Sequence, residues 1–203
     1  MLITFEGIDF CGKSTQVKRL EDRVRASDRT VRVLREPGGT PIGEVIRGLL
    51  LDRAHAAMTD AGELLLFSAS RSQLVQDVVR PALNAGTVVI LDRYYDSTTA
   101  YQGYGRGIPL DVIHAVNRFA TGGLVPDLTF LLDIPEDEIE RRMQQVRHTG
   151  DRMESSGRQF YGRVRAGYRA LAGKESRFRM LDGMKPVDDL ERMIWEEVRQ
   201  WLT

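Results

Sequence analysis

The stretch from Gly7 to Ser14 reads GIDFCGKS and matches the phosphate-binding pattern G-x-x-x-x-G-K-[ST]. Its glycines let backbone N–H groups surround phosphate oxygens, and the helix expected after it directs the positive end of its dipole toward them. In such a loop the Lys13 ammonium contacts the β- and γ-phosphates of a nucleotide, and the Ser14 hydroxyl binds Mg²⁺. Cys11, inside the loop, is interpreted as a small filler residue. The pattern therefore predicts a site for nucleotide phosphates and Mg²⁺.

A second group of polar residues follows the apolar run Val88–Leu91, which is expected to be a buried strand. Ligands on parallel sheets bind at the carboxyl ends of the strands. Asp92 is therefore predicted to lie near the metal, and Arg93 to hold a phosphate with two hydrogen bonds. The alternative is that the two residues form only a local ion pair at the surface.

Phe67 and Arg71 are four residues apart in an expected helix, so they share one face of it. A phenylalanine can stack on a nucleobase, and an arginine can donate hydrogen bonds to a base carbonyl. On these two residues alone, the favoured interpretation is a core phenylalanine beside a solvated arginine.

A phosphate-binding loop occurs in kinases, motor ATPases and GTPase switches, and does not choose between them. The sequence lacks the N-K-x-D guanine motif of a Ras-type switch, and 203 residues leave little room for the assembly modules of a large ATPase. Several arginines in or near expected loops favour transfer between two phosphorylated substrates.

Short apolar runs alternate with helical patterns along the chain, which is typical of a parallel sheet covered by helices on both faces. The expected strands are Leu2–Phe5, Thr30–Leu34, Val88–Leu91, Leu128–Ile134 and Phe178–Leu181. The expected helices are Lys13–Ala26, one opened by Pro41, one capped by Thr59 and ending near Pro81–Leu83, Pro109–Thr121, one from Pro135 to about Val146, Gly157–Ala172 and Val187–Leu202. Glycine-rich stretches at Gly103–Gly107 and Gly150–Gly157 are candidate mobile loops.

Six stretches together resemble thymidylate kinases, and the resemblance extends over almost the whole chain. They are FEGIDFCGKST (Phe5–Thr15), REPGGT (Arg35–Thr40), LLLFSASRSQ (Leu64–Gln73), DRYYDSTTAYQGYGRG (Asp92–Gly107), PDLTFLLD (Pro126–Asp133) and GDRMES (Gly150–Ser155). The resemblance implies a single domain over residues 1–203 with the three-layer α/β fold of P-loop kinases. That fold has a five-stranded parallel sheet flanked by helices, and a mobile lid at about residues 142–157.

The resemblance also implies transfer of the ATP γ-phosphate to dTMP, giving dTDP, with Mg²⁺ as cofactor. It assigns the phosphate loop to ATP through Gly7, Ile8, Asp9, Phe10, Cys11, Gly12, Lys13, Ser14 and Thr15. It assigns the acceptor site to Asp9, Glu36, Arg47, Phe67, Arg71, Arg93, Tyr101 and Gln102. In that site Phe67 stacks on thymine, Arg71 forms hydrogen bonds with the base and Arg93 binds the dTMP phosphate. Tyr101 crowds the sugar 2′ position, and Asp9 lies near the 3′-hydroxyl.

Some members of the family carry a catalytic arginine inside the phosphate loop, where this chain has Phe10 and Cys11. In the other members the lid supplies that cation. Arg147 and Arg152 are therefore predicted to be catalytic, together with Lys13, Arg93, Asp9 and Asp92. Arg147 is the first candidate, and Arg142, further back on a helix, is the third.

The composition excludes several other classes of protein. The chain carries 29 Lys plus Arg and 29 Asp plus Glu, so its formal net charge is zero. A general nucleic-acid or membrane-surface binder is normally basic. One cysteine forbids an intrachain disulfide and favours a reducing, cytoplasmic location. The expected partners are ATP, dTMP and a second copy of the chain, because the family commonly forms homodimers; the helix at Leu64–Val78 is the candidate interface.

Two alternatives stay open. The first is another nucleoside monophosphate kinase or one of broader pyrimidine specificity, which assays with different acceptors distinguish. The second is a nucleotide-binding regulator without catalysis, which the presence of Lys13, Ser14 and Arg93 disfavours. A structural or interaction protein is the least favoured class.

Overall fold

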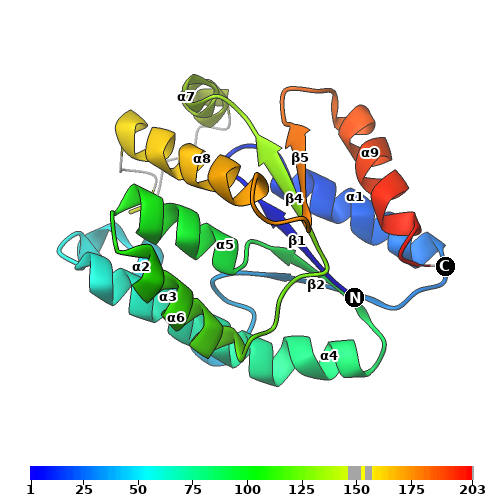
Figure 1. Cartoon of the computed structure of the whole chain (residues 1–203), viewed down its shortest axis with the longest axis horizontal. Coiled ribbons are helices and arrows are strands. Elements are labelled where there is room, and N and C mark those ends of the chain that lie inside the picture. The colour runs from blue at the N-terminus through cyan, green and yellow to red at the C-terminus, as the bar shows by residue number, and fades with distance from the viewer. Residues whose placement is uncertain (146–151, 154–156, 203) are drawn as a thin grey trace.

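A five-stranded parallel sheet forms the centre of the molecule, with the strand order β2-β3-β1-β4-β5 (Figure 1). The computed structural model describes residues 1–145, 152–153 and 157–202. The strands are β1 (Leu2–Glu6), β2 (Val31–Arg35), β3 (Val88–Asp92), β4 (Leu128–Asp133) and β5 (Phe178–Asp182). The prediction of a parallel α/β sheet is confirmed, and each expected strand agrees with the observed one to within one residue at either end.

Helices cover both faces of the sheet, with α1 and α9 on one side and α3, α4, α6 and α8 on the other (Figure 1). The α-helices are α1 (Lys13–Ala26), α2 (Pro41–Leu51), α3 (Asp60–Leu74), α4 (Arg80–Asn84), α5 (Tyr95–Thr98), α6 (Leu110–Thr121), α7 (Glu136–Gln145), α8 (Arg158–Ala172) and α9 (Val187–Arg199). Shorter turns are the 3₁₀ turn Arg53–His55 and the π-helical segments Val75–Val79 and Thr99–Gly105. Within the described residues, no helix is long and apolar enough to cross a bilayer.

The core forms because alternate residues of each strand face opposite helical layers. In β3, Val88 and Ile90 belong to the cluster that includes the apolar side of α1. Val89 and Leu91 belong instead to the cluster that contains Leu74 of α3. All five residues of β1 are buried, which fixes this strand at the centre of the sheet.

Two predicted helix starts are confirmed by their capping side chains. Thr40 accepts a hydrogen bond from the backbone N–H of Gly43 at the start of α2, where Pro41 is the first helical residue. Thr59 accepts one from Gly62 at the start of α3. The helix after Thr59 continues through the π-helical segment Val75–Val79 into α4, as expected for one long helical run.

The prediction of a mobile loop at Gly103–Gly107 is wrong for its first half. Gly103 and Gly105 lie in the π-helical continuation of α5, which packs closely on α8. A Cβ atom at Gly105 would lie 2.6 Å from the Phe160 ring, and one at Gly167 would lie 2.7 Å from the Tyr104 ring. These glycines therefore allow close helix packing rather than mobility. The second candidate loop, Gly150–Gly157, falls mostly outside the described residues.

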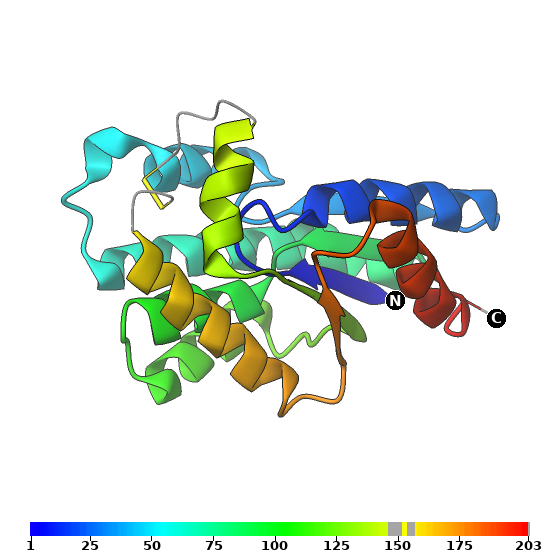
Figure 2. The same ribbon diagram turned by 90° about the horizontal axis from the view of Figure 1, so that it is seen from above.

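The parallel topology brings the carboxyl ends of the strands to one edge of the sheet. The phosphate loop follows β1, Glu36 follows β2 and Arg93 follows β3. Figure 2 shows α7 rising beside the loop that joins β1 to α1. Three separate stretches of the sequence thus converge at one place.

Candidate active site

The phosphate loop has a backbone that depends on its glycines. Gly7 and Gly12 have φ angles of +137° and +99°, and a Cβ atom at Gly7 would lie 2.5 Å from the Leu132 carbonyl oxygen. The Lys13 ammonium is buried and donates to the carbonyl oxygens of Gly7 (3.1 Å) and Ile8 (3.0 Å). Cys11 is buried, which agrees with its interpretation as a filler residue.

Ser14 and Asp92 lie together, as their positions in the sequence predict. The Ser14 hydroxyl donates to the Asp92 carboxylate at 2.8 Å. Mg²⁺ prefers oxygen ligands and is commonly held by one or two protein groups plus substrate phosphates. A hydroxyl and a carboxylate at the mouth of a phosphate loop fit that requirement. The described residues contain no cluster of three or more His, Cys, Asp or Glu that would hold a metal ion without a nucleotide.

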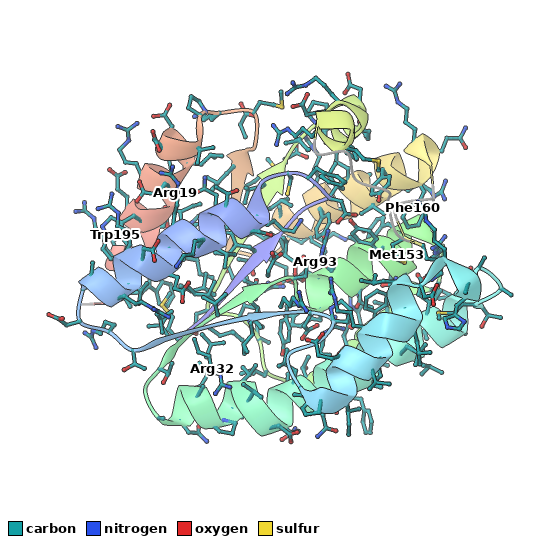
Figure 3. All side chains as sticks on the ribbon, turned by 180° about the vertical axis from the view of Figure 1, so that it is seen from behind. Arg19, Arg32, Arg93, Met153, Phe160 and Trp195 are labelled. Carbon is teal, nitrogen blue, oxygen red and sulfur yellow. The ribbon has the colours of Figure 1, made fainter. Side chains whose placement is uncertain are left out.

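One cavity beside this loop is lined by all eight residues predicted to bind the acceptor. They are Asp9, Glu36, Arg47, Phe67, Arg71, Arg93, Tyr101 and Gln102. Its empty volume, part of it open to solvent, is about 600 Å³, within the usual range for small-molecule sites. Figure 3 shows Arg93 near the middle of the molecule and Met153, another lining residue, toward one end.

Arg93 connects the phosphate loop with this cavity. Its Nη1 donates to the carbonyl oxygen of Gly7 (2.9 Å), and its Nη2 donates to the carboxylate of Asp9 and to the Tyr101 hydroxyl (3.2 Å). Arg93 has a φ of +70°, in the left-handed region that a non-glycine residue seldom adopts. Such backbone strain is concentrated at functional sites. The alternative of a simple surface ion pair between Asp92 and Arg93 does not match these contacts.

The Asp9 carboxylate is bonded by the side chains of Arg93, Tyr101 and Tyr161, and the sequence did not predict the contact with Tyr161. Its Oδ2 accepts hydrogen bonds from the hydroxyls of Tyr101 and Tyr161, both at 3.1 Å. Burial alone would raise the pKa of Asp9, but the nearby charges of Arg93 and Lys13 keep it below the ordinary value. Asp9 is therefore an anion. Tyr161 lies on α8, far along the chain, and no local motif marks it.

Glu6 lies beneath Arg93 and was also missed. Its Oε2 accepts from the hydroxyls of Ser97 (2.6 Å) and Tyr168 (3.0 Å), and its Oε1 accepts from the backbone N–H of Tyr94 (2.8 Å). Burial and the charge of Asp96 raise the pKa of Glu6 to about 7. The Ser97 and Tyr168 hydroxyls also accept from Arg93 Nη1, both at 3.2 Å. Glu6 is therefore linked to the Arg93 guanidinium through the hydroxyls of Ser97 and Tyr168 and helps to fix its position.

Arg71 is fully buried, so its interpretation as a solvated arginine is wrong. Its Nε donates to Glu36 at 2.7 Å, and its Nη1 donates to Thr98 (2.9 Å) and Asn117 (3.3 Å). Burial raises the pKa of Glu36 to about 7, against the opposing effect of Arg71. A buried guanidinium such as that of Arg71 keeps its charge in a protein interior only when it is paired and hydrogen-bonded. Phe67, one helical turn before Arg71, is partly exposed on the cavity wall.

Comparison with known proteins identifies the family. The model of the family described as Thymidylate kinase matches residues 5–194. The thymidylate kinase of Chlorobaculum parvum is 50% identical, and the comparison covers 96% of this chain and 93% of that protein. The thymidylate kinase of Caldanaerobacter subterraneus is 44% identical, and the comparison covers 98% of this chain and 95% of that protein. The chain belongs to the thymidylate kinase family.

The three arginines considered for catalysis in this thymidylate kinase family member differ in position. Arg142, on α7, donates to the carbonyl oxygens of Phe10 in the phosphate loop (3.0 Å) and of Gly183 (3.1 Å). Arg142 therefore lies at the phosphate loop, whereas its place further back on a helix predicted a position more distant from that loop. Arg152 forms an ion pair with Glu63 at 2.7 Å. Arg147 lies outside the described residues.

Two further residues that are predicted to bind the acceptor have protein partners. Arg47 donates from Nη1 to the Pro37 carbonyl oxygen at 3.0 Å. The Gln102 amide donates to Glu63 Oε1 at 2.7 Å. Glu63 thus contacts both Gln102 and Arg152, although no sequence motif singled it out. A glutamate at a helical position with apolar neighbours gives no signal in a single sequence.

Proposed function

We propose that this chain transfers the γ-phosphoryl group of ATP to dTMP, giving ADP and dTDP, for dTTP synthesis. The observation that carries the proposal is the position of Asp9 and Arg93, which line both the acceptor cavity and the mouth of the phosphate loop. An acceptor whose phosphate meets Arg93 lies directly beside the γ-phosphate of a nucleotide in the loop. Membership of the thymidylate kinase family supports dTMP as that acceptor.

The proposed mechanism uses positioning and charge. A phosphate monoester has a second pKa near 6, so the dTMP phosphate is mostly a dianion at pH 7 and attacks without a general base. The protein brings two anions into line and neutralises the charge that develops. Lys13 contacts the β- and γ-phosphates of the donor, and Arg93 binds the phosphate of the acceptor. Ser14 and Asp92 would hold Mg²⁺, which when bound with the nucleotide neutralises phosphate charge.

A coupled assay of ADP release with a panel of monophosphates tests this function. We expect dTMP to be the best acceptor, with dUMP, UMP, CMP and AMP used less well. Equal turnover of UMP and CMP would favour the alternative of a broader pyrimidine kinase. ATP binding without any phosphoryl transfer would favour the nucleotide-binding regulator.

We expect Tyr101→Ala to improve the relative use of ribonucleotide acceptors. The Tyr101 ring is packed edge-on by Phe160 and Tyr161, so its bulk is fixed in the cavity. Removing it opens space beside the sugar 2′ position. The measurement is the ratio of kcat/KM for dTMP to that for ribothymidine monophosphate.

Tyr101→Phe is the matched control for this prediction. It keeps the ring and removes only the hydroxyl that contacts Asp9 and Arg93. The selectivity ratio should fall with alanine and stay near the wild-type value with phenylalanine. An unchanged ratio in the alanine variant would mean that Tyr101 does not exclude acceptors with a 2′-hydroxyl.

We propose Arg147 as the arginine that reaches the transferred phosphoryl group from the lid, at about residues 142–157. The support is that the phosphate loop has no arginine, so the cation must come from another segment, and that the family resemblance places Arg147 in the lid. We expect Arg147→Ala to lower kcat by about 10²-fold or more while both nucleotide dissociation constants stay nearly unchanged. Single-turnover rates and titrations with each nucleotide measure this. A kcat within a few-fold of wild type would show that the cation comes from elsewhere.

A homodimer is part of the proposal. Large apolar side chains are exposed on α2, α3 and α6, among them Val45, Leu65 and Phe119, the last 89% exposed. Exposed apolar groups of this size favour a protein contact, and the homodimers common in the family make a second copy the expected partner. Sedimentation of the purified chain measures the oligomeric state. The cytoplasmic location stays a prediction from the single cysteine, which cell fractionation tests.

A further inference from the structure

Glu63 is the centre of a buried group of charges that the proposed mechanism does not use. Its side chain, on α3, is 1% exposed. It accepts hydrogen bonds from Gln102 (2.7 Å) and from Arg106 Nε and Nη2 (both 3.2 Å), and it forms an ion pair with Arg152 Nη1 at 2.7 Å. Burial opposes its ionisation, but these donors hold the pKa of Glu63 below its ordinary value.

Arg152 is fixed to α2 as well as to Glu63. Its backbone N–H donates to the Leu51 carbonyl oxygen at 3.1 Å, and its Nε donates to the Leu50 carbonyl oxygen at 2.8 Å. These carbonyls belong to the last turn of α2, where they have no partner within the helix. The Arg152 side chain is only 8% exposed. Its guanidinium is thus committed to protein groups on more than one side.

Met153, the next residue, is buried and lines the acceptor cavity together with Leu51, Phe67 and Gln102. Its sulfur lies 3.3 Å from Arg152 Nη2 and 4.0 Å from Arg106 Nη2. Arg106 in turn stacks on the Phe160 ring, with 4.6 Å from its Cζ to the ring centroid. Figure 3 shows Met153 and Phe160 close together at the same end of the molecule.

We propose that Glu63 is a positioning residue for dTMP binding: through Arg152 it holds Met153 in the wall of the acceptor cavity, and Arg152 serves this wall rather than the transferred phosphoryl group. The inference rests on the proposed function, because it names dTMP as the occupant of the cavity. It also separates the roles of the two arginines predicted to be catalytic.

The physical reason is that a buried carboxylate shared by two guanidiniums has a strict geometry. Each guanidinium is a planar fork with fixed donor directions, so Glu63 determines where Arg106 and Arg152 lie. Arg106 is 21% exposed and keeps an ion pair with Asp60 when the Glu63 charge is removed. Arg152, which is only 8% exposed, loses its ion-pair partner, and this drives its guanidinium toward solvent. Met153 and Gln102 then lose their fixed positions in the cavity wall.

The test compares Glu63→Gln, Arg152→Gln and the double variant with the wild-type enzyme. Glutamine keeps the size of Glu63 and removes its charge. In each single variant we expect the dissociation constant of dTMP to rise at least about ten-fold. The dissociation constant of ATP and kcat at saturating dTMP should stay within about three-fold. The double variant should be no worse than about the poorer single variant, because both changes break the same link.

Glu197→Gln is the matched control, since Glu197 pairs with Arg179 at 2.8 Å on β5 and α9, away from the cavity. It should leave dTMP binding unchanged. Arg152→Lys keeps a charge opposite Glu63 and should lose less affinity than Arg152→Gln.

Three results would overturn the inference. The first is a large fall in kcat for Arg152→Gln with unchanged dTMP affinity, which would make that arginine catalytic. The second is a lower melting temperature for Glu63→Gln with unchanged dTMP affinity, which would make Glu63 only structural. The third is additive losses in the double variant. A wild-type enzyme that binds no dTMP would overturn the proposed function as well, so the two failures are distinguishable.

Discussion

Lys13→Ala is expected to fold and to lose phosphoryl transfer by about 10²- to 10³-fold in kcat, the usual effect of removing one group that stabilises transition-state charge. Lys13 is one of only four lysines in the chain, and its ammonium lies inside the phosphate loop. A positive charge there acts on the phosphates where negative charge develops. The measurement is the steady-state rate of ADP release with saturating ATP and dTMP.

Lys18→Ala is the matched control for that variant. Lys18 lies on the same helix, but it is exposed and pairs with Asp22. Its removal should leave kcat within about two-fold, because exposed ion pairs contribute little. Because the Lys13 ammonium also bonds two loop carbonyls, Lys13→Met, which keeps the aliphatic chain, separates lost charge from a deformed loop. Near-normal turnover in a folded Lys13→Ala enzyme would contradict the assignment of the phosphate loop.

Periodicity and capping residues were sufficient to predict the sheet and most of the helices. The strands β1, β3 and β4 are buried along almost their whole length, so their sequence signal is a continuous apolar run with clear ends. The helix after Arg93 was missed because glycines at 103, 105 and 107 are typical of a loop. Gly105 is required by the close approach of α8 and Gly103 by that of Leu110 on α6, and no local pattern contains such tertiary contacts.

Most residues that line the acceptor cavity were assigned through the family resemblance, and only Arg93, after a strand, and Phe67 and Arg71, on one helix face, were also singled out by their positions. The residues that support this cavity were not predicted. Tyr161 and Tyr168 come from α8, and they hold Asp9 and Glu6 across more than 150 positions of sequence. Such contacts depend on how α8 crosses the sheet. A single sequence shows residue types and spacing along the chain, and for these tyrosines neither is unusual.

The buried arginines show the same limit in another way. Arg71 looked like a solvated residue because arginine is rarely buried without a partner. Its partners, Glu36 and Asn117, are distant in sequence, so only the fold shows that its charge is compensated. Arg93 differs, because its place directly after a strand was enough to predict that it faces the site.

Arg93→Ala is expected to weaken dTMP binding by about 2 kcal/mol or more, which is at least about thirty-fold, while ATP binding changes little. The guanidinium lines the cavity and donates to the Gly7 carbonyl oxygen, a position in which it would meet the phosphate of a monoester bound in the cavity. A fork of donors matches a phosphate better than a single ammonium does. Arg93→Lys should therefore recover only part of the loss. Separate calorimetric titrations with dTMP and with ATP measure both affinities.

Arg93 also forms an ion pair with Asp9. The experiment must therefore distinguish the loss of the Arg93 charge from a displacement of Asp9. Asp9→Asn is the comparison variant, since it breaks that pair and leaves the Arg93 guanidinium in place. If Arg93 acts directly on the acceptor phosphate, Asp9→Asn should retain much more dTMP affinity than Arg93→Ala. The left-handed backbone at residue 93 is equally unfavourable for arginine and alanine, so backbone strain does not separate the wild type from this variant. Equal losses of dTMP and ATP affinity in Arg93→Ala would instead place the guanidinium on the donor side of the reaction.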